Sequence, residues 1–128
     1  MIRIACATDD DVHFYRGHFG DAPYYLIYEM EEDGRYSVAE RIENTTPKER
    51  MHGDPEKAKG IKEIMKKEFV DVLINIQFGP NIKRIRKNFV PVLSNIKEIE
   101  PALNHLANRM GEIKDELKKQ EKKIIILP

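Results

Sequence analysis

The strongest candidate for chemistry in this chain is a histidine beside a flexible glycine. His18-Phe19-Gly20 is followed by Ala22-Pro23-Tyr24-Tyr25, so the histidine stands just before an apolar strand. A neutral imidazole binds iron, zinc and similar metals well. Glycine lets the backbone approach a bound group closely. The segment therefore predicts a cofactor-binding site at His18, Phe19 and Gly20, with direct metal or cluster coordination by His18 and close approach of the backbone at Gly20. The alternative is that Phe19 fills the core and Gly20 only makes the turn.

Two further histidines are candidates for the same metal. His13 lies five residues before His18, and His52 stands in a later connection, before the first helix. If these connections open at one end of the sheet, the three imidazoles would converge. A lone loop histidine is more often a surface residue, so His13 and His52 are weaker candidates than His18. His105 lies on the predicted C-terminal helix, beside its row of apolar residues, and we interpret it as structural.

A second candidate segment is Gly79-Pro80-Asn81, which precedes a short basic helix running through Lys87. The start of a helix offers backbone N–H groups and a positive dipole end, which suit a phosphate or carboxylate. We expect Gly79, Pro80 and Asn81 to contact anionic groups on a bound cofactor. The same pattern is also ordinary helix initiation, and it lacks the glycine richness of a P-loop.

An acidic run supports a different chemistry. Asp9, Asp10 and Asp11 follow the first strand, and Asp71 begins another. Together they could bind magnesium for phosphoryl transfer, as in a nuclease-like enzyme. A turn-forming acidic run is the commoner explanation.

Cys6 is the only cysteine, which excludes an internal disulfide and a four-thiolate zinc or iron–sulfur site built from one chain. Alternation places it on the strand face shared by Ile2 and Ile4, as a small buried hydrophobe. We assign it no cluster.

Composition limits the partners. The 128 residues, 41% of them apolar, suffice for one globular core. Lysines and arginines number 22 and acids also 22, so no net charge draws the protein to nucleic acid or an anionic membrane. Without a basic leader or an apolar run of membrane length, the chain is expected to be soluble and cytoplasmic.

The first half of the chain predicts an antiparallel meander. Residues 2–7, 24–30 and 36–42 have the composition of strands, and Asp33-Gly34 suits a hairpin between the last two. Asp54-Pro55-Glu56 then predicts the start of a helix, because it supplies a capping carboxylate, a first-turn proline and an acid near the positive dipole end.

The second half predicts a βαβ unit. Residues 70–76 read as a buried central strand and residues 89–93 as the next, where Pro91 indicates a sheet edge. The fold class is therefore α/β, with a mixed five-stranded sheet flanked by helices. Residues 1–106 form this domain, and residues 107–128 extend it within the same globular unit.

The C-terminal part is expected to continue as one helix. Its apolar seam has a heptad-like spacing and consists of Ile99, Leu103, Leu106, Met110, Ile113 and Leu117. We interpret it as a helix docked on its own sheet; the alternative is that it projects beyond the sheet and forms a homodimer. Residues 124–127 are so β-prone and apolar that they must be paired or buried.

The order of several short motifs resembles the dinitrogenase iron-molybdenum cofactor biosynthesis family, across roughly residues 2–106. The matching motifs are Ile4-Ala5, Thr8-Asp9-Asp10, His18-Phe19-Gly20, Ala22-Pro23-Tyr24-Tyr25, His52-Gly53, Val70-Asp71-Val72-Leu73-Ile74 and Gly79-Pro80-Asn81. The family includes NifX-like carriers and the C-terminal domain of NifB-like proteins. The resemblance implies a ribonuclease-H-like motif that binds iron-molybdenum cofactor or its iron–sulfur precursors.

The chain also departs from the family. Many members have a glycine-rich turn where this sequence has Asn75-Ile76-Gln77-Phe78, and many end earlier. The expected function is a noncatalytic cluster carrier that receives its cargo from a donor protein and releases it to an acceptor. One histidine without a cysteine cage suits transient holding. The alternatives are an interaction module of the same fold and, less favoured, the magnesium-dependent nuclease.

Overall fold

The structure is a computed structural model that describes residues 1–47 and 54–128, and within these residues six strands form one mixed sheet. The strand order is β3-β2-β1-β4-β5-β6. β2 is antiparallel to β1 and β3, whereas β1, β4, β5 and β6 run parallel. The strands are β1 (Ile2–Thr8), β2 (Tyr24–Met30), β3 (Tyr36–Glu43), β4 (Val72–Asn75), β5 (Val90–Ser94) and β6 (Ile125–Leu127). The predicted α/β class, a meander followed by parallel strands, is confirmed.

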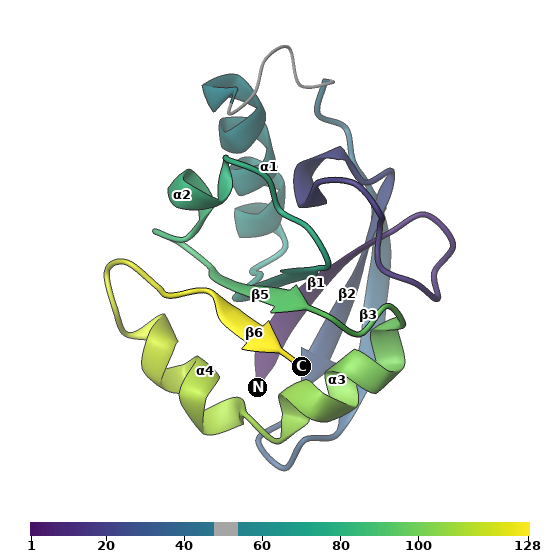
Figure 1. The fold of residues 1–128 in the computed structure, drawn as a ribbon, viewed down its shortest axis with the longest axis vertical. Coiled ribbons are helices and arrows are strands. Elements are labelled where there is room, and N and C mark those ends of the chain that lie inside the picture. The colour runs from purple at the N-terminus through teal and green to yellow at the C-terminus, as the bar shows by residue number, and fades with distance from the viewer. Residues whose placement is uncertain (48–53) are drawn as a thin grey trace.

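Helices cover both faces of this sheet (Figure 1). α1 (Pro55–Lys67) and α2 (Ile82–Ile85) lie on one face, and α3 (Ile99–Ala107) and α4 (Met110–Leu117) lie on the other. A short 3-10 turn, η1 (Phe19–Asp21), stands between β1 and β2. α1 begins as predicted, since the Asp54 carboxylate accepts the Glu56 N–H at 3.0 Å and Pro55 occupies the first turn.

Side-chain alternation along the strands divides the interior into two cores. Ile4, Cys6 and Val72 face α3 and α4, whereas Ala5, Ala7 and Leu73 face α1 and α2. Cys6 therefore shares its face with Ile2 and Ile4, as predicted, and burial raises the pKa of its thiol well above the ordinary range. This thiol is packed and protonated.

β6 corrects the predicted strand count from five to six. Residues 125–127 pair in parallel with β5, and Ile125 and Leu127 are buried, so the expectation that this apolar run would be paired or buried is confirmed. Consequently the prediction that Pro91 lies in an edge strand is wrong. The N–H of Val90 donates to the Asp71 carbonyl on the β4 side, so the nitrogen of Pro91 faces the β6 side. Pairing of β5 with β6 begins only at Val92, so the missing N–H of Pro91 leaves that ladder intact.

One glutamate fastens this last strand to α4. Glu116 is buried, and its carboxylate accepts hydrogen bonds from Lys119 Nζ and from the backbone N–H of Lys123, each at 2.8 Å. These hydrogen bonds hold the pKa of Glu116 below its ordinary value. The carboxylate form therefore anchors the loop that leads into β6.

The C-terminal segment forms two helices with a break at Asn108 and Arg109, where a single helix was expected. The helix axis bends at this break while α4 continues across the same face of the sheet (Figure 1). The apolar seam packs into the core, with Ile99, Leu103, Leu106, Met110 and Ile113 all buried. Docking on the chain's own sheet is thus confirmed, and projection of the seam beyond the sheet is wrong. A homodimer through the exposed side of these helices stays a prediction.

Candidate functional site

The imidazole of His18 lies directly against the backbone of Gly79. A Cβ atom placed on Gly79 would stand 2.6 Å from His18 Nδ1 and 2.8 Å from its Cγ, and the glycine has a φ of +79°. Both the space and the left-handed backbone therefore require glycine here. The two segments that sequence analysis singled out separately, at residues 18–20 and 79–81, meet in the fold.

Hydrogen bonds between the two loops hold this contact in place. The N–H of Phe19 donates to the Gln77 carbonyl at 3.0 Å. The amide of Asn75, at the end of β4, donates to the carbonyls of Gly17 and Gln77 at 3.0 and 2.8 Å. Within the described residues, Asn75 Oδ1 is the one buried side-chain N or O atom left without a hydrogen-bond partner. The end of β4 thus fixes both loops that carry the candidate site.

A small pocket opens between these loops and the helices α1 and α2. Its volume is about 20 Å³, enough for a water-sized group. A larger group that reaches His18 would therefore sit over the mouth of the pocket. The lining residues are His18, Gly20, Asp21, Lys57, Ala58, Ile61, Phe78, Pro80, Asn81 and Ile85.

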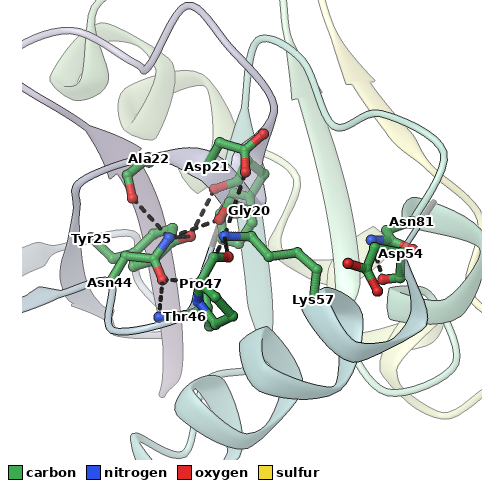
Figure 2. Close-up of polar contacts among 11 residues, drawn as sticks. Gly20, Asp21, Ala22, Tyr25, Asn44, Thr46, Pro47, Asp54, Lys57 and Asn81 are labelled. Carbon is green, nitrogen blue, oxygen red and sulfur yellow. Dashed lines mark hydrogen bonds and ion pairs between the residues drawn. The ribbon is translucent and has the colours of Figure 1, made fainter. Parts of the chain in front are cut away.

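The turn that carries His18 is held from behind by β2 and the end of β3 (Figure 2). The Tyr25 hydroxyl donates to the Phe19 carbonyl at 2.7 Å, and the Asn44 amide donates to the carbonyls of Gly20 and Ala22 at 2.7 and 2.9 Å. Three of the four carbonyl groups of residues 19–22 thus accept a side-chain hydrogen bond. The turn is a rigid platform for the imidazole.

Lys57 ties α1 to the same turn. Its side chain is 5% exposed, and its ammonium donates to Thr46 Oγ1 at 2.6 Å and to the Pro47 carbonyl at 2.8 Å (Figure 2). The Asp21 carboxylate lies 3.4 Å away. A buried ammonium needs such partners to offset its desolvation. It places a positive charge on the wall of the His18 pocket.

The structure corrects the expectation for Phe19. Its ring is fully buried, 5.4 Å from the Phe78 ring centroid and 4.9 Å from that of Tyr25. Direct contact with a bound cofactor is inconsistent with this burial. Phe19 instead anchors the turn in the core, and so orients its neighbour His18.

Gly20 and the start of α2 also differ from expectation in detail. A Cβ on Gly20 would meet Ile61 at 3.5 Å, an ordinary contact, so the fold itself does not demand glycine there. The predicted basic helix through Lys87 is only Ile82–Ile85, and the N–H groups of Ile82 and Lys83 close its first turn onto Gly79 and Pro80. These two N–H groups are consequently not directed at the pocket. Asn81 lines the pocket while its amide donates to the Asp54 carbonyl at 3.0 Å.

The other predicted metal ligands lie elsewhere. His13 borders a separate crevice of about 750 Å³ beyond the carboxyl ends of β1, β4 and β5, lined also by Asp9, Asp10, Phe14, Arg16, Ile76 and Lys97. Its Nδ1 lies 2.7 Å from the Asp10 carboxylate, and it is not among the residues that line the His18 pocket. His52 lies outside the described residues. His105 is exposed on α3.

The magnesium site suggested by the acidic run is not assembled. Asp10 accepts the N–H groups of His13 and Val12 at 2.7 and 2.9 Å, and these bonds, the His13 one foremost, hold its pKa well below the ordinary value. The turn explanation is thus confirmed. Asp71 instead accepts the Arg3 N–H at the opposite end of β1, roughly 20 Å from Asp9 at 3.3 Å per residue.

A comparison with protein families reveals a match to most of the chain. The family described as dinitrogenase iron-molybdenum cofactor matches residues 1–109. The chain belongs to this family. A comparison with curated proteins found no match. The family indicates a part in the biosynthesis or binding of iron-molybdenum cofactor, and the match ends at the break between α3 and α4.

The possible donor side chains of this dinitrogenase iron-molybdenum cofactor family member are dispersed over the described residues. Among residues 1–47 and 54–128, no group of three or more histidine, cysteine, aspartate or glutamate side chains is arranged to hold a metal ion. Cys6 is buried and protonated. The pocket itself contributes one imidazole, that of His18, packed on Gly79. None of the helices in the described residues is long and apolar enough to span a membrane.

Sequence reasoning missed two residues that build the platform of this family member. Lys57 was not among the predicted site residues, yet it precedes Ile61 and Met65 by four and eight positions, which places it on the buried side of α1. That spacing was a readable signal. Asn44 offered none, because its amide bonds depend on how β3 ends beside the turn.

Proposed function

We propose that this protein is a noncatalytic carrier that holds iron-molybdenum cofactor, or an iron–sulfur precursor of it, between a donor and an acceptor protein. The observation that carries the proposal is the His18 imidazole, seated on Gly79 at the mouth of a pocket and mounted on a rigid turn. The family match supports the class of cargo.

In this proposal, His18 is the ligand that the pocket presents to the cluster. The turn held by Tyr25 and Asn44 fixes the direction of the imidazole before the cargo arrives, which lowers the ordering cost of binding. Gly79 leaves the space that the imidazole occupies, and Gly20 keeps the backbone bare in the pocket wall. Lys57 fastens this turn to α1 through Thr46, Pro47 and Asp21.

Transient holding follows from the number of ligands. A cluster fastened by one imidazole exchanges more readily than one enclosed by several thiolates, because each protein ligand adds to the barrier for release. A carrier needs that exchange, whereas a storage or redox protein does not. His13 and His52 stay predicted further ligands, His13 from the separate crevice that it borders.

The test is an anaerobic titration of the purified protein with isolated iron-molybdenum cofactor, followed by visible absorption and EPR. We expect saturable binding by the wild type and its loss in His18→Ala. His105→Ala is the matched control, since His105 is exposed on α3 and outside the pocket, and it should bind like the wild type. His13→Ala in the same titration tests the second predicted ligand. Equal binding by wild type and His18→Ala, or binding by neither, would overturn the proposal.

A further inference from the structure

A basic groove runs between α1 and α2, next to the His18 pocket but outside it. Its volume is about 260 Å³. It shares Ala58 and Ile85 with the wall of the His18 pocket, so the two hollows are neighbours. The groove is lined by Pro55, Ala58, Lys59, Lys62, Arg84, Ile85, Lys87 and Asn88.

The lining carries charge of only one sign. Four of its residues are lysine or arginine and none is acidic. The chain has no aspartate or glutamate between Asp71 and Glu98, a stretch that includes all of α2. In the described part of the chain, no ion pair involves Lys59, Lys62 or Lys87. A protein with a formal net charge of zero thus concentrates cations at one groove.

The floor of the groove is apolar. Ala58 and Ile85 are 5% and 4% exposed, and Pro55 stands at one end. An apolar floor inside a basic rim resembles a protein interface, in which a buried apolar anchor is surrounded by polar contacts. Lys59 and the half-buried Lys62 lie on α1, and the exposed Arg84 and Lys87 lie on α2 and in the turn after it, so the cations are spread along the groove. This spacing suits an extended acidic chain better than a single small anion.

Nucleic acid fits the groove less well. Binding of a single strand combines a basic channel with aromatic side chains on which bases stack, and this lining has no aromatic residue. Nor does the whole chain carry the net positive charge of a nucleic-acid-binding domain. An acidic peptide with aliphatic side chains satisfies both the rim and the floor.

We propose that the groove between α1 and α2 docks an acidic segment of a partner protein, with glutamates or aspartates against Lys59, Lys62, Arg84 and Lys87 and an aliphatic side chain on Ala58 and Ile85. The proposal does not depend on what binds at His18. Its position beside that pocket would bring a docked partner to the place where cargo enters or leaves.

The test uses a fluorescein-labelled peptide made of three Glu-Glu-Leu-Glu repeats, titrated with the full chain and followed by fluorescence anisotropy. The variant Lys59→Gln/Lys62→Gln/Lys87→Gln removes three rim charges without disturbing buried groups. The variant Lys66→Gln/Lys67→Gln/Lys118→Gln removes the same charge outside the groove. Each exposed ion pair contributes about twofold to fivefold in affinity, so the groove variant should bind roughly tenfold or more weakly. The control variant should stay within about threefold, the weaker long-range effect expected in salt.

Three further readings separate the outcomes. Replacing the leucines of the peptide by serine should weaken binding by the wild type, because the floor loses its apolar contact. His18→Ala should bind the peptide like the wild type, and the groove variant should still bind iron-molybdenum cofactor, which keeps this proposal separate from the carrier function. Three outcomes would each overturn the proposal. The peptide does not bind, or both lysine variants weaken its binding equally. The third is that an oligothymidine strand binds more tightly than the peptide and loses this binding in the groove variant.

Discussion

Replacing Gly79 by alanine tests how the fold seats the imidazole of His18. The new Cβ would lie 2.6 Å from His18 Nδ1, where ordinary contact begins at 3.4 Å, so the ring must retreat by about 0.8 Å. The φ of +79° adds a backbone cost of about 1–2 kcal/mol for a residue with a Cβ. We therefore expect the free energy of unfolding to fall by about 1–2 kcal/mol or more.

The same substitution should also weaken cofactor binding, because it moves the ligand. Displacing a group that orients a metal ligand typically lowers affinity about 10- to 100-fold. Urea unfolding measures the first effect, and the anaerobic cofactor titration measures the second on protein that is still folded.

Gly111→Ala is the control for Gly79→Ala. A Cβ at Gly111 meets no atom within 4 Å, and alanine favours the helix by up to about 1 kcal/mol, so this variant should be at least as stable as the wild type and bind normally. If Gly79→Ala matches the wild type in both stability and affinity, the argument that Gly79 seats His18 is wrong.

Four other sites give separate tests, one of them with a neighbouring substitution as its control. Gly20→Ala should leave urea stability within about 0.5 kcal/mol of the wild type, since its Cβ makes only ordinary contacts, yet weaken cofactor binding if the bare backbone serves the cargo. Leu127→Ala should lower the free energy of unfolding by about 2–5 kcal/mol, because this side chain is fully buried. Ile126→Ala, at a side chain 55% exposed, should lower it by less than about 1 kcal/mol. Equal losses would contradict the packing of β6 in the core. Phe69 is 79% exposed and ends α1 with a φ of +57°, so Phe69→Gly should raise thermal stability by about 0.5–1 kcal/mol, and a loss would show that the ring makes a contact not seen here. The pKa of Glu116 is depressed in the folded state, so its contribution to the free energy of unfolding is fully present above the ordinary carboxylate pKa and is lost as pH falls through the depressed value. Glu116→Gln should therefore lower the free energy of unfolding by about 1–2 kcal/mol at neutral pH and flatten its dependence on acid pH. A pH profile of stability that runs parallel to that of the wild type would contradict this role.

The sequence predicted most of the elements because their signals are local. Asp54-Pro55-Glu56 caps α1 through its own side chain and ring, and Asp33-Gly34 turns the β2–β3 hairpin with a φ of +91° at the glycine. Such features depend on a few neighbouring residues. The family resemblance likewise rested on short motifs in a fixed order.

The sequence predicted less well what depends on distant pairing. The break at Asn108 and Arg109 has no proline to signal it, and the seam spacing continues across it. Only after the chain turns back beyond α4 can β6 pair with β5, so the strand count and the position of Pro91 were missed together. The approach of His18 to Gly79 arises in the same way, because Asn75 joins the two loops only once β4 lies beside β1.

The central claim is that the His18 imidazole coordinates the cargo. The most direct measurement is pulsed EPR on the complex of iron-molybdenum cofactor with protein whose histidines carry ¹⁵N, compared with the ¹⁴N protein and with His18→Ala. We predict a nitrogen hyperfine coupling that changes with the isotope in the wild type and in His105→Ala and is absent in His18→Ala. A bound cluster without any histidine nitrogen coupling, or with a coupling that persists in His18→Ala, would contradict the account.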